Sequence, residues 1–333
     1  MNTYCESPAL EKSNSADSEF HIAFCVDRGY FLSMGATIVS IIKNNPNVKF
    51  VFHVMTFAIP DADRSRLEEL ERKFDVRVIP HVIDQDIFKQ FSHLIKYSHY
   101  SLSTFTRLIV PNILKGVTSR VLYLDADILC VGKISELIEL NIDDEIAVVA
   151  PDAEVTMRRR CKALNLKTPL YFNGGFLFMN IEKWIENRIS EQAIEILVKE
   201  NKKLRFNDQD ALNIVLDGRI RYIETKWNYL YGLVGDLEID KRKMDIKGDA
   251  VFIHFAGAVK PWNNWNGHDS KDLFMEYHSI SPWLDVPIDD VPQNYKEMRM
   301  FSRFLFKRRQ FLSSVTWYFR YLSKKVSHMK IAG

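Results

Sequence analysis

The sequence predicts an α/β fold with a mainly parallel sheet, and three observations support this prediction. Short apolar runs of strand length alternate with amphipathic runs of helical length. The chain has 333 residues, 47% hydrophobic and 26% charged, which is ordinary for a globular protein with one large domain or two modest ones. Polar residues stand just past several apolar runs, where open α/β sheets bind their ligands.

The first 114 residues contain three expected strands and three expected helices. The strands are short apolar runs over residues 20–26, 50–57 and 76–83. The helices show apolar residues at helical spacing over 31–44, 60–74 and 103–114. Pro60 stands near the start of the second helix, and Pro111 is expected to interrupt the third.

The same alternation of strands and helices is expected in the rest of the chain. Residues 120–133 are an apolar run that we expect to be one buried strand, although it contains two aspartates. Further strands are expected over 146–151, 174–180, 221–227 and 250–257. The chain contains no internal repeat and no low-complexity tract.

Composition restricts the cellular compartment and the domain organisation of the protein. None of the four cysteines belongs to a C-x-x-C pair, and two lie in apolar runs, which indicates free thiols in a reducing compartment. The polar, serine-rich residues 1–19 lack the apolar region of a signal peptide and are expected to form a flexible extension. No apolar run approaches the roughly 18 residues that a membrane-spanning helix needs. We expect a catalytic domain over 20–290 and a separate tail over 291–333.

This tail is strongly basic. Residues 298–333 hold nine Lys or Arg and no Asp or Glu, so the overall charge of +2 divides into +9 here and −7 in the first 297 residues. Apolar residues recur at helical spacing, namely Phe301, Phe304, Leu305, Leu312, Val315, Phe319, Leu322 and Val326. The pattern predicts a helix on an anionic membrane surface; the alternative is a helix packed on the catalytic domain. So continuous an apolar stripe argues against a nucleic-acid partner.

Asp125 and Asp127 are the most informative pair in the sequence. On one strand they project to the same side, and they stand at the carboxyl end of an apolar run. Two close carboxylates repel each other, and a divalent cation such as Mg²⁺ or Mn²⁺ removes the repulsion and can hold a diphosphate. The alternative for an isolated D-x-D is a pair of helix-capping or solvated acids.

The pair is not isolated, because other polar residues border apolar runs. They are Asp27, Tyr30, His99, Arg107, Asn173, Asp208, Gln209, Asp210, His254, Gly257, Lys260 and Trp262. Several of them have a structural alternative: Tyr30 and the tryptophans can be core, His254 can end a strand, and Asp208 and Asp210 can cap a helix. We assign Asp210 a structural role. The run Arg158–Arg160 is interpreted as a solvated face, unless an acceptor phosphate lies nearby.

The motifs LYLDAD, YFNGG, NDQD and HFAGAVKPW, in this order within about residues 20 to 290, resemble glycosyltransferase family 8. Within it, the chain looks most like the bacterial lipopolysaccharide core α-glucosyl- and galactosyltransferases. The resemblance implies a GT-A fold, Rossmann-like with a mainly parallel mixed sheet and a small helical C-terminal region. It also implies a retaining enzyme on the inner face of the cytoplasmic membrane. That enzyme would move glucose or galactose from a UDP-sugar to the lipopolysaccharide core, with Mn²⁺ or Mg²⁺ as cofactor.

The resemblance also implies roles for single residues. Asp27 resembles the carboxylate that binds uracil, and Tyr30 the ring that stacks on it. Asp125, Asp127 and His254 resemble the metal ligands, with Asp125 also near the ribose. Contacts to the diphosphate are implied for Gly257 and Lys260. The catalytic groups around the donor sugar are implied to be Arg107, Asn173, Asp208 and Gln209, and the acceptor contacts His99 and Asp152.

Two departures from the family pattern affect binding. Gly29 stands where the family often has Asn, so a ribose contact is expected to be missing. Gly174 replaces a commoner Ala, so the sugar pocket is expected to be slightly wider.

The chemistry of Gln209 favours one retaining mechanism. An uncharged amide is a poor nucleophile, so front-face attack is favoured over a covalent intermediate. A nucleotidyltransferase is the alternative enzyme, but the Gly-rich phosphate loop expected of it is absent near the N-terminus. A membrane-surface nucleotide-sugar-binding protein would leave the catalytic motifs unexplained. Glucose and galactose donors differ in one hydroxyl orientation, which the sequence does not resolve.

Overall fold

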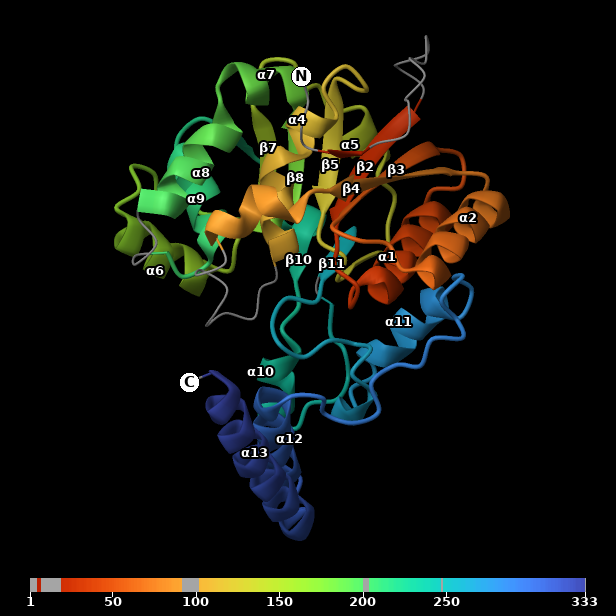
Figure 1. The fold of residues 1–333 in the computed structure, drawn as a ribbon, viewed down its shortest axis with the longest axis vertical. Helices are drawn as coiled ribbons and strands as arrows, with labels where there is room; N and C mark the ends of the chain where they lie inside the picture. Colours follow the sequence, from red (N-terminus) through yellow and green to blue (C-terminus); the bar gives the residue numbers. More distant parts are fainter. Residues whose placement is uncertain (1–4, 7–18, 92–101, 200–203, 247, 333) are drawn as a thin grey trace.

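Four parallel strands form the centre of the main sheet in the computed structural model, which describes residues 5–6, 19–91, 102–199, 204–246 and 248–332 (Figure 1). Their order across the sheet is β4-β3-β2-β5. Their bounds are Glu19–Cys25 for β2, Lys49–Thr56 for β3, Arg77–Ile83 for β4 and Arg120–Leu124 for β5. Every pair of neighbours among them is parallel, as the alternation of strands and helices predicts.

Other strands extend this sheet on both sides. Strand β8 (Phe172–Asn180) pairs antiparallel with both β5 and β7 (Ala147–Pro151), and β9 (Arg221–Tyr222) follows β7 in parallel. At the opposite edge, β1 (Cys5–Glu6) pairs antiparallel with β4. Part of the expected N-terminal extension therefore contributes an edge strand. The result is a mixed, mostly parallel sheet flanked by helices, as in the expected GT-A fold.

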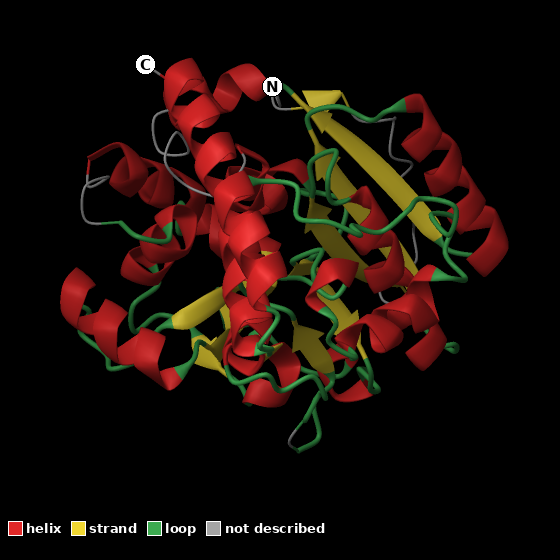
Figure 2. Ribbon diagram, turned by 90° about the horizontal axis from the view of Figure 1, so that it is seen from below, coloured by secondary structure: helices red, strands yellow, loops and turns green. Residues whose placement is uncertain are grey.

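Helices cover both faces of the sheet (Figures 1 and 2). On one face lie α1 (Phe31–Asn44), α2 (Asp61–Phe74) and α11 (Ser270–His278). The other face is covered by η1 (Gln85–Phe91), η2 (Leu102–Ile109), α4 (Val110–Ile113), α7 (Ile181–Glu186), α8 (Ile189–Lys199) and α9 (Asn207–Val215). Strand side chains alternate between the two cores, so Ile22 and Phe24 face the first and Ala23 the second.

The connection between β5 and β6 corrects the expected strand 120–133. The chain leaves the main sheet after Leu124 and enters a three-stranded sheet at β6 (Ile128–Cys130). The Asp125 N–H still bonds to the Gly175 carbonyl of β8, whereas the Asp127 carbonyl accepts from Phe255 N–H beyond β11. The hydrogen-bond ladder between β5 and β8 and the ladder between β6 and β11 therefore separate at Ala126. Both aspartates therefore lie between two strands, and the expected projection from one face of a single strand is wrong.

The small sheet also shortens two other expected strands. Residues 250–257 contain only β11 (Phe252–His254), which pairs with β6 and with β10 (Tyr229–Leu230). Residues 221–227 contain β9, and the 3₁₀ helix η3 (Thr225–Asn228) follows. The expected helix 103–114 is mainly the 3₁₀ helix η2. Pro111 lies in the first turn of α4 and does not interrupt a longer helix, because a first turn needs no N–H at that position.

Four further helices among the described residues lie in the connections between these elements. Their bounds are Ser135–Ile138 for α5, Glu154–Leu164 for α6, Leu233–Glu238 for α10 and Asn264–Asn266 for η4. Cys25, Cys130 and Cys161 are free thiols, as the sequence predicts.

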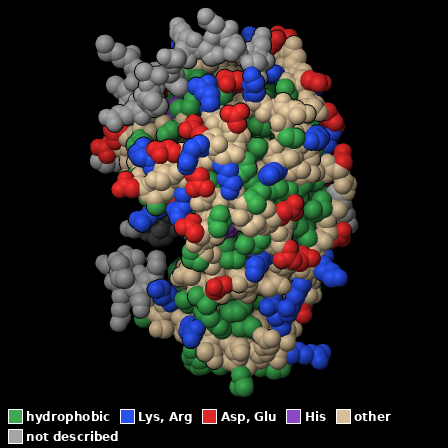
Figure 3. Space-filling model, turned by 90° about the vertical axis from the view of Figure 1, so that its right-hand side faces the viewer, with side chains coloured by type: hydrophobic (Ala, Val, Ile, Leu, Met, Phe, Trp, Pro, Cys, Tyr) green, Lys and Arg blue, Asp and Glu red, His purple; other side chains and the backbone are tan. Residues whose placement is uncertain are grey.

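The chain ends in a hairpin of two helices, α12 (Tyr295–Lys307) and α13 (Phe311–Ala332). Helix α12 packs on the rest of the protein: Phe304 is buried, and Phe301 meets Trp265 edge to face at a centroid distance of 5.4 Å. Helix α13 leaves apolar side chains in solvent, with Leu312 88% and Phe319 65% exposed. Hydrophobic and basic side chains share the lower end of the molecule in Figure 3. Within the described part of the chain, no helix has the length and apolar character needed to cross a membrane.

Candidate active site

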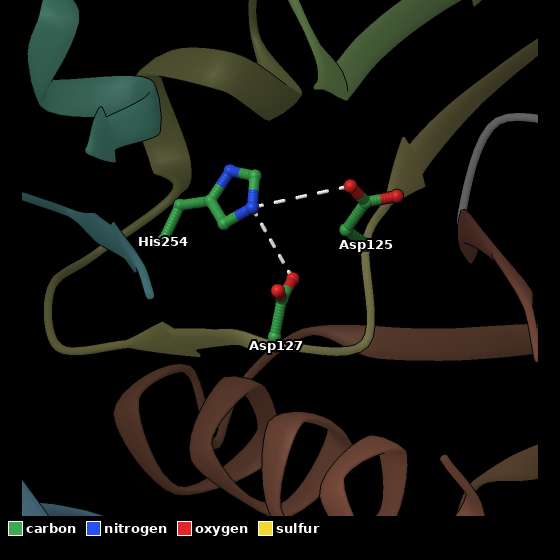
Figure 4. Close-up of side chains that lie close together, drawn as sticks. All are labelled: Asp125, Asp127 and His254. Carbon is green, nitrogen blue, oxygen red and sulfur yellow. Dashed lines mark ion pairs between the residues drawn. The ribbon is translucent and has the colours of Figure 1, made fainter. Parts of the chain in front are cut away.

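Three predicted metal ligands converge where the two sheets meet (Figure 4). Asp125 and Asp127 come from the β5–β6 connection, and His254 is the last residue of β11. His254 Nε2 lies 3.2 Å from Asp127 Oδ1 and 3.9 Å from Asp125 Oδ2. One ligand atom from each residue lies within 4.8 Å of the other two. Residues 125 and 254 are far apart in the chain and meet because β6 pairs with β11.

These residues fit a divalent cation. Asp127 Oδ1 is buried and makes no hydrogen bond among the described residues, although His254 Nε2 lies 3.2 Å away; such a carboxylate oxygen is costly unless a cation compensates it. Two carboxylates and one imidazole form a donor set for a divalent ion, and the oxygen ligands favour Mg²⁺ or Mn²⁺. Gly175 of β8 makes the approach possible, because a Cβ there would lie 2.4 Å from His254 Cε1 and 2.9 Å from Asp125 Oδ2.

Lys260 lies beside the same carboxylates. Its ammonium pairs with Asp127 Oδ2 and donates to the Phe255 carbonyl at 2.8 Å. Burial raises the pKa of Asp127, but the Lys260 ammonium outweighs burial and holds that pKa well below its usual value. Burial likewise lowers the pKa of Lys260, and Asp127 and Tyr30 overcome this effect and raise it. The site therefore contains a charged lysine next to an ionised carboxylate.

Arg107 of η2 joins three segments of the site. Its Nη2 lies 3.1 Å from Asp125 Oδ1, its Nε 2.9 Å from Asp208 Oδ2 at the start of α9, and its Nη1 donates to the Gly174 carbonyl at 2.7 Å. Tyr123 donates to the same Asp125 oxygen at 2.5 Å. Burial raises the pKa of Asp208 to about 6, although Arg107 opposes the rise. A single buried guanidinium thus fixes the positions of two predicted site carboxylates.

Gln209 is held on both sides of its amide. Its Oε1 accepts from Gly174 N–H at 2.9 Å, and its Nε2 donates to Asp152 Oδ2 at 3.1 Å and to Tyr171 Oη at 3.0 Å. Asn173 Nδ2 donates to the same Asp152 oxygen at 3.3 Å. Burial raises the pKa of Asp152 despite these hydrogen bonds. Predicted catalytic and acceptor residues therefore form one connected group.

The residues predicted to bind the nucleotide lie at the more exposed end of the site. Tyr30 is 37% exposed and meets Trp262 edge to face at 6.1 Å between ring centroids. Asp27 Oδ1 accepts from Gly29 N–H at 3.0 Å. Gly257 is exposed and has φ +106°, a conformation that favours glycine. His99, an expected acceptor contact, lies outside the described residues.

The structure corrects one expectation and supplies residues that sequence reasoning missed. Arg160 is buried and pairs with Asp210 through Nε at 3.0 Å and Nη2 at 2.7 Å, so its assignment to a solvated charge run is wrong. Asp210 is structural, as expected. Tyr171 was missed, although it directly precedes Phe172 in the YFNGG motif. Asn228, which bonds to His254, follows a tryptophan in no recognisable motif.

The fold and the convergence of these side chains at strand ends define a glycosyltransferase of the GT-A type. The chain belongs to glycosyl transferase family 8, whose family model matches residues 21–266, and the C-terminal model of the same family matches residues 269–325.

Proteins of known activity are similar to the chain over most of its length. The lipopolysaccharide 1,3-galactosyltransferase of Salmonella typhimurium is 31% identical over 94% of this chain and 93% of its own. A lipopolysaccharide 1,2-glucosyltransferase of Escherichia coli is 28% identical over 89% of this chain and 88% of its own. The galactosyltransferase LgtC, solved with donor and acceptor sugar analogues, has a TM-score of 0.67 at 21% identity, covering 83% of this chain and 99% of LgtC. That similarity shows a shared fold.

Proposed function

We propose that this protein is a metal-dependent, retaining glycosyltransferase that moves a glucose or galactose unit from a UDP-sugar to the lipopolysaccharide core oligosaccharide. The observation that carries the proposal is the cluster of Asp125, Asp127 and His254 beside the connected group of Arg107, Asp208 and Gln209. Lipopolysaccharide glucosyl- and galactosyltransferases among the relatives support the choice of acceptor and sugar.

The nucleotide would lie along the exposed end of the site. Asp27 and Tyr30 would hold the uracil, and Asp125 would also lie near the ribose. Asp125, Asp127 and His254 would hold the divalent ion, whose positive charge stabilises the departing diphosphate when it is bound. Lys260 and the backbone of Gly257 would contact the diphosphate, and the lysine would neutralise charge that develops on the leaving oxygen.

The donor sugar would lie between Arg107, Asn173, Asp208 and Gln209. The acceptor hydroxyl, oriented by Asp152 and His99, attacks the anomeric carbon on the face from which the UDP leaves. The carbon–oxygen bond to the diphosphate breaks, the new glycosidic bond forms, and the acceptor proton passes to the leaving diphosphate oxygen. Gln209 Oε1 already accepts from Gly174 N–H, so it is a weak nucleophile that instead stabilises the positive carbon electrostatically.

A transfer assay tests this function. The full chain would be incubated with Mn²⁺ or Mg²⁺, a panel of UDP-hexoses and truncated core oligosaccharides, and the product's anomeric configuration would be determined by NMR. We expect one hexose to be transferred with retention and the Asp127→Ala variant to be inactive yet folded. The exposed Asp143, close before β7, gives a matched control, since Asp143→Ala should keep full activity. Full activity in excess chelator would refute the metal requirement.

We further propose that the enzyme works at the inner face of the bacterial cytoplasmic membrane, to which the C-terminal hairpin attaches it. The hairpin combines exposed apolar side chains on α13 with an excess of basic residues and no acids beyond Glu297. A cavity of about 370 Å³ lies between the two helices, lined by Ser302, Arg303, Phe306, Lys307, Ser314, Val315 and Tyr318. Cations next to exposed apolar groups suit a surface of anionic lipids.

A further inference from the structure

We infer that Asn228 is a positioning residue that holds the metal ligand His254 in one tautomer and one ring orientation, an inference that rests on the proposed function. Asn228 is buried at the end of η3, and its Oδ1 lies 3.0 Å from His254 Nδ1. Its Nδ2 lies 3.1 Å from Asn173 Oδ1, and Asn173 Nδ2 lies 3.3 Å from Asp152 Oδ2. These contacts form a continuous chain from Asp152 to His254.

The direction of this chain is determined at two points. An ionised carboxylate only accepts, so the Asn173 atom that faces Asp152 has to be its amide nitrogen. Gly175 N–H donates at 3.0 Å to the other end of the Asn173 amide, and a backbone N–H only donates. Both contacts identify the same Asn173 atom as oxygen. The Asn228 atom facing that oxygen is therefore the nitrogen, and Asn228 turns its oxygen toward His254.

This orientation of Asn228 determines which ring nitrogen of His254 carries the proton. Because an oxygen faces Nδ1, this nitrogen carries the proton when the site holds its cation, and the lone pair of Nε2 is then directed at that cation. Nε2 is the atom that faces Asp127 and Asp125. Partners that fix the tautomer of a histidine ligand in this way typically change metal affinity 10- to 100-fold when they are removed. Gly175 contributes twice, since its N–H sets the direction of the chain and its missing Cβ leaves room for the ring.

The first test measures the binding of Mn²⁺ alone to the metal-free protein by electron paramagnetic resonance. We expect Asn228→Ala to weaken binding about 10- to 100-fold. Asn228→Asp keeps an acceptor for Nδ1 and should weaken it less. Asn45 provides the matched control, because it is equally buried and hydrogen-bonded but lies at the end of α1. Asn45→Ala should lose stability and keep the wild-type affinity.

The outcomes separate this inference from the proposed function. Wild-type protein that fails to bind Mn²⁺ would refute the metal requirement itself. If the wild-type protein binds Mn²⁺ and Asn228→Ala binds it equally well, the positioning role of Asn228 is refuted while the metal requirement stands. Equal weakening of binding in both Asn228 variants would have the same meaning.

A second measurement needs no folded Asn228 variant. Imidazole nitrogen shifts of the wild-type protein saturated with diamagnetic Mg²⁺, assigned through loss of the His254 signals in His254→Gln, should show the proton on Nδ1. A proton on Nε2 would overturn the inference.

Discussion

At the scale of single residues, Gly175 shows how backbone packing determines the candidate metal site. A β-carbon at this position would overlap His254 and approach Asp125 Oδ2 to 2.9 Å, whereas one at Gly174 would meet Arg107 Nη1 at 3.1 Å. The two adjacent glycines therefore have different tolerances. Gly175 is the one that lies directly against two candidate metal ligands.

We predict that Gly175→Ala weakens Mn²⁺ binding at least tenfold and lowers the free energy of unfolding by about 1–3 kcal/mol, because His254 has to move. Calorimetric titration and denaturant unfolding measure the two effects. Gly235→Ala is the matched control and should keep near-wild-type Mn²⁺ affinity, since a β-carbon there meets no other described atom within 4 Å. Equal loss of affinity in both variants would contradict the prediction.

Gln209 gives a second prediction at this scale. Gln209→Ala removes the amide that contacts Asp152, Tyr171 and Gly174, and we expect turnover to fall about 10- to 100-fold without reaching zero, as for the loss of one electrostatic group. Steady-state kinetics with the active donor measure the change. Trapping a sugar covalently bound to Gln209 of the wild-type enzyme would disprove front-face attack.

At the scale of secondary-structure elements, three adjacent strands carry a row of buried histidines. His21 on β2, His53 on β3 and His81 on β4 are linked by ring nitrogen contacts of 3.0 Å each. Burial lowers the pKa of all three, well below the usual value for His53 and to about 4 for His81. Glu19 opposes the shift of His21, whereas Arg77 adds to it. The three rings are therefore neutral in the folded protein at neutral pH.

This row predicts a pH dependence of stability. The pKa values are lower in the folded than in the unfolded state, so below about pH 6.5 the unfolded chain binds more protons and acidification favours unfolding. We expect the free energy of unfolding to fall between pH 7 and pH 5 by up to about 1.4 kcal/mol per pH unit for each histidine.

Urea unfolding at both pH values, compared with a His53→Gln, His81→Gln double variant, measures this contribution. The comparison is necessary because Asp208, with its raised pKa, acts in the opposite direction. If the variant loses as much stability on acidification as the wild type, the histidine row does not cause the effect.

At the scale of the whole molecule, the C-terminal hairpin is the part that the proposed membrane attachment requires. Helix α12 packs on the protein through Phe304, whereas α13 exposes Leu312, Val315 and Phe319. The packing of α12 agrees with the alternative of a helix on the catalytic domain, and membrane attachment through α13 stays a prediction. Helix α13 presents exposed apolar side chains together with basic residues.

We predict that a chain ending at Pro292 no longer sediments with anionic vesicles and keeps part of its activity on detergent-dispersed acceptor. Each basic residue near such a surface contributes roughly 1 kcal/mol, so binding by the full chain should weaken as salt rises. Vesicle sedimentation at low and high salt measures both effects. Full-length protein with Leu312→Ser and Phe319→Ser is the control for folding, and it should bind less while keeping its activity. Undiminished sedimentation of the truncated chain would show that the anchor lies elsewhere.

The sequence by itself determined most elements of the main sheet and the residue types of the candidate site. The expected strand 20–26 is β2 at Glu19–Cys25, and the expected helix 31–44 is α1 without change. Apolar periodicity suffices there, because each element buries a continuous local stripe. Asp125 and Asp127 could be selected as candidate metal ligands because two close carboxylates repel each other unless a cation compensates them. The candidate role of His254 came from the resemblance of its motif to the family.

Only the tertiary structure decided where the strands break and how the side chains are oriented. The apolar run at 120–133 divides at Ala126 because β5 pairs with β8 and β6 with β11, and both partners follow much later in the chain. Arg160 is buried because Asp210, fifty residues away, supplies a bidentate partner. The direction of the Asp152–Asn173–Asn228–His254 chain depends on which donors and acceptors meet in space. Local periodicity carries no information about such contacts, since each partner comes from a different, distant segment.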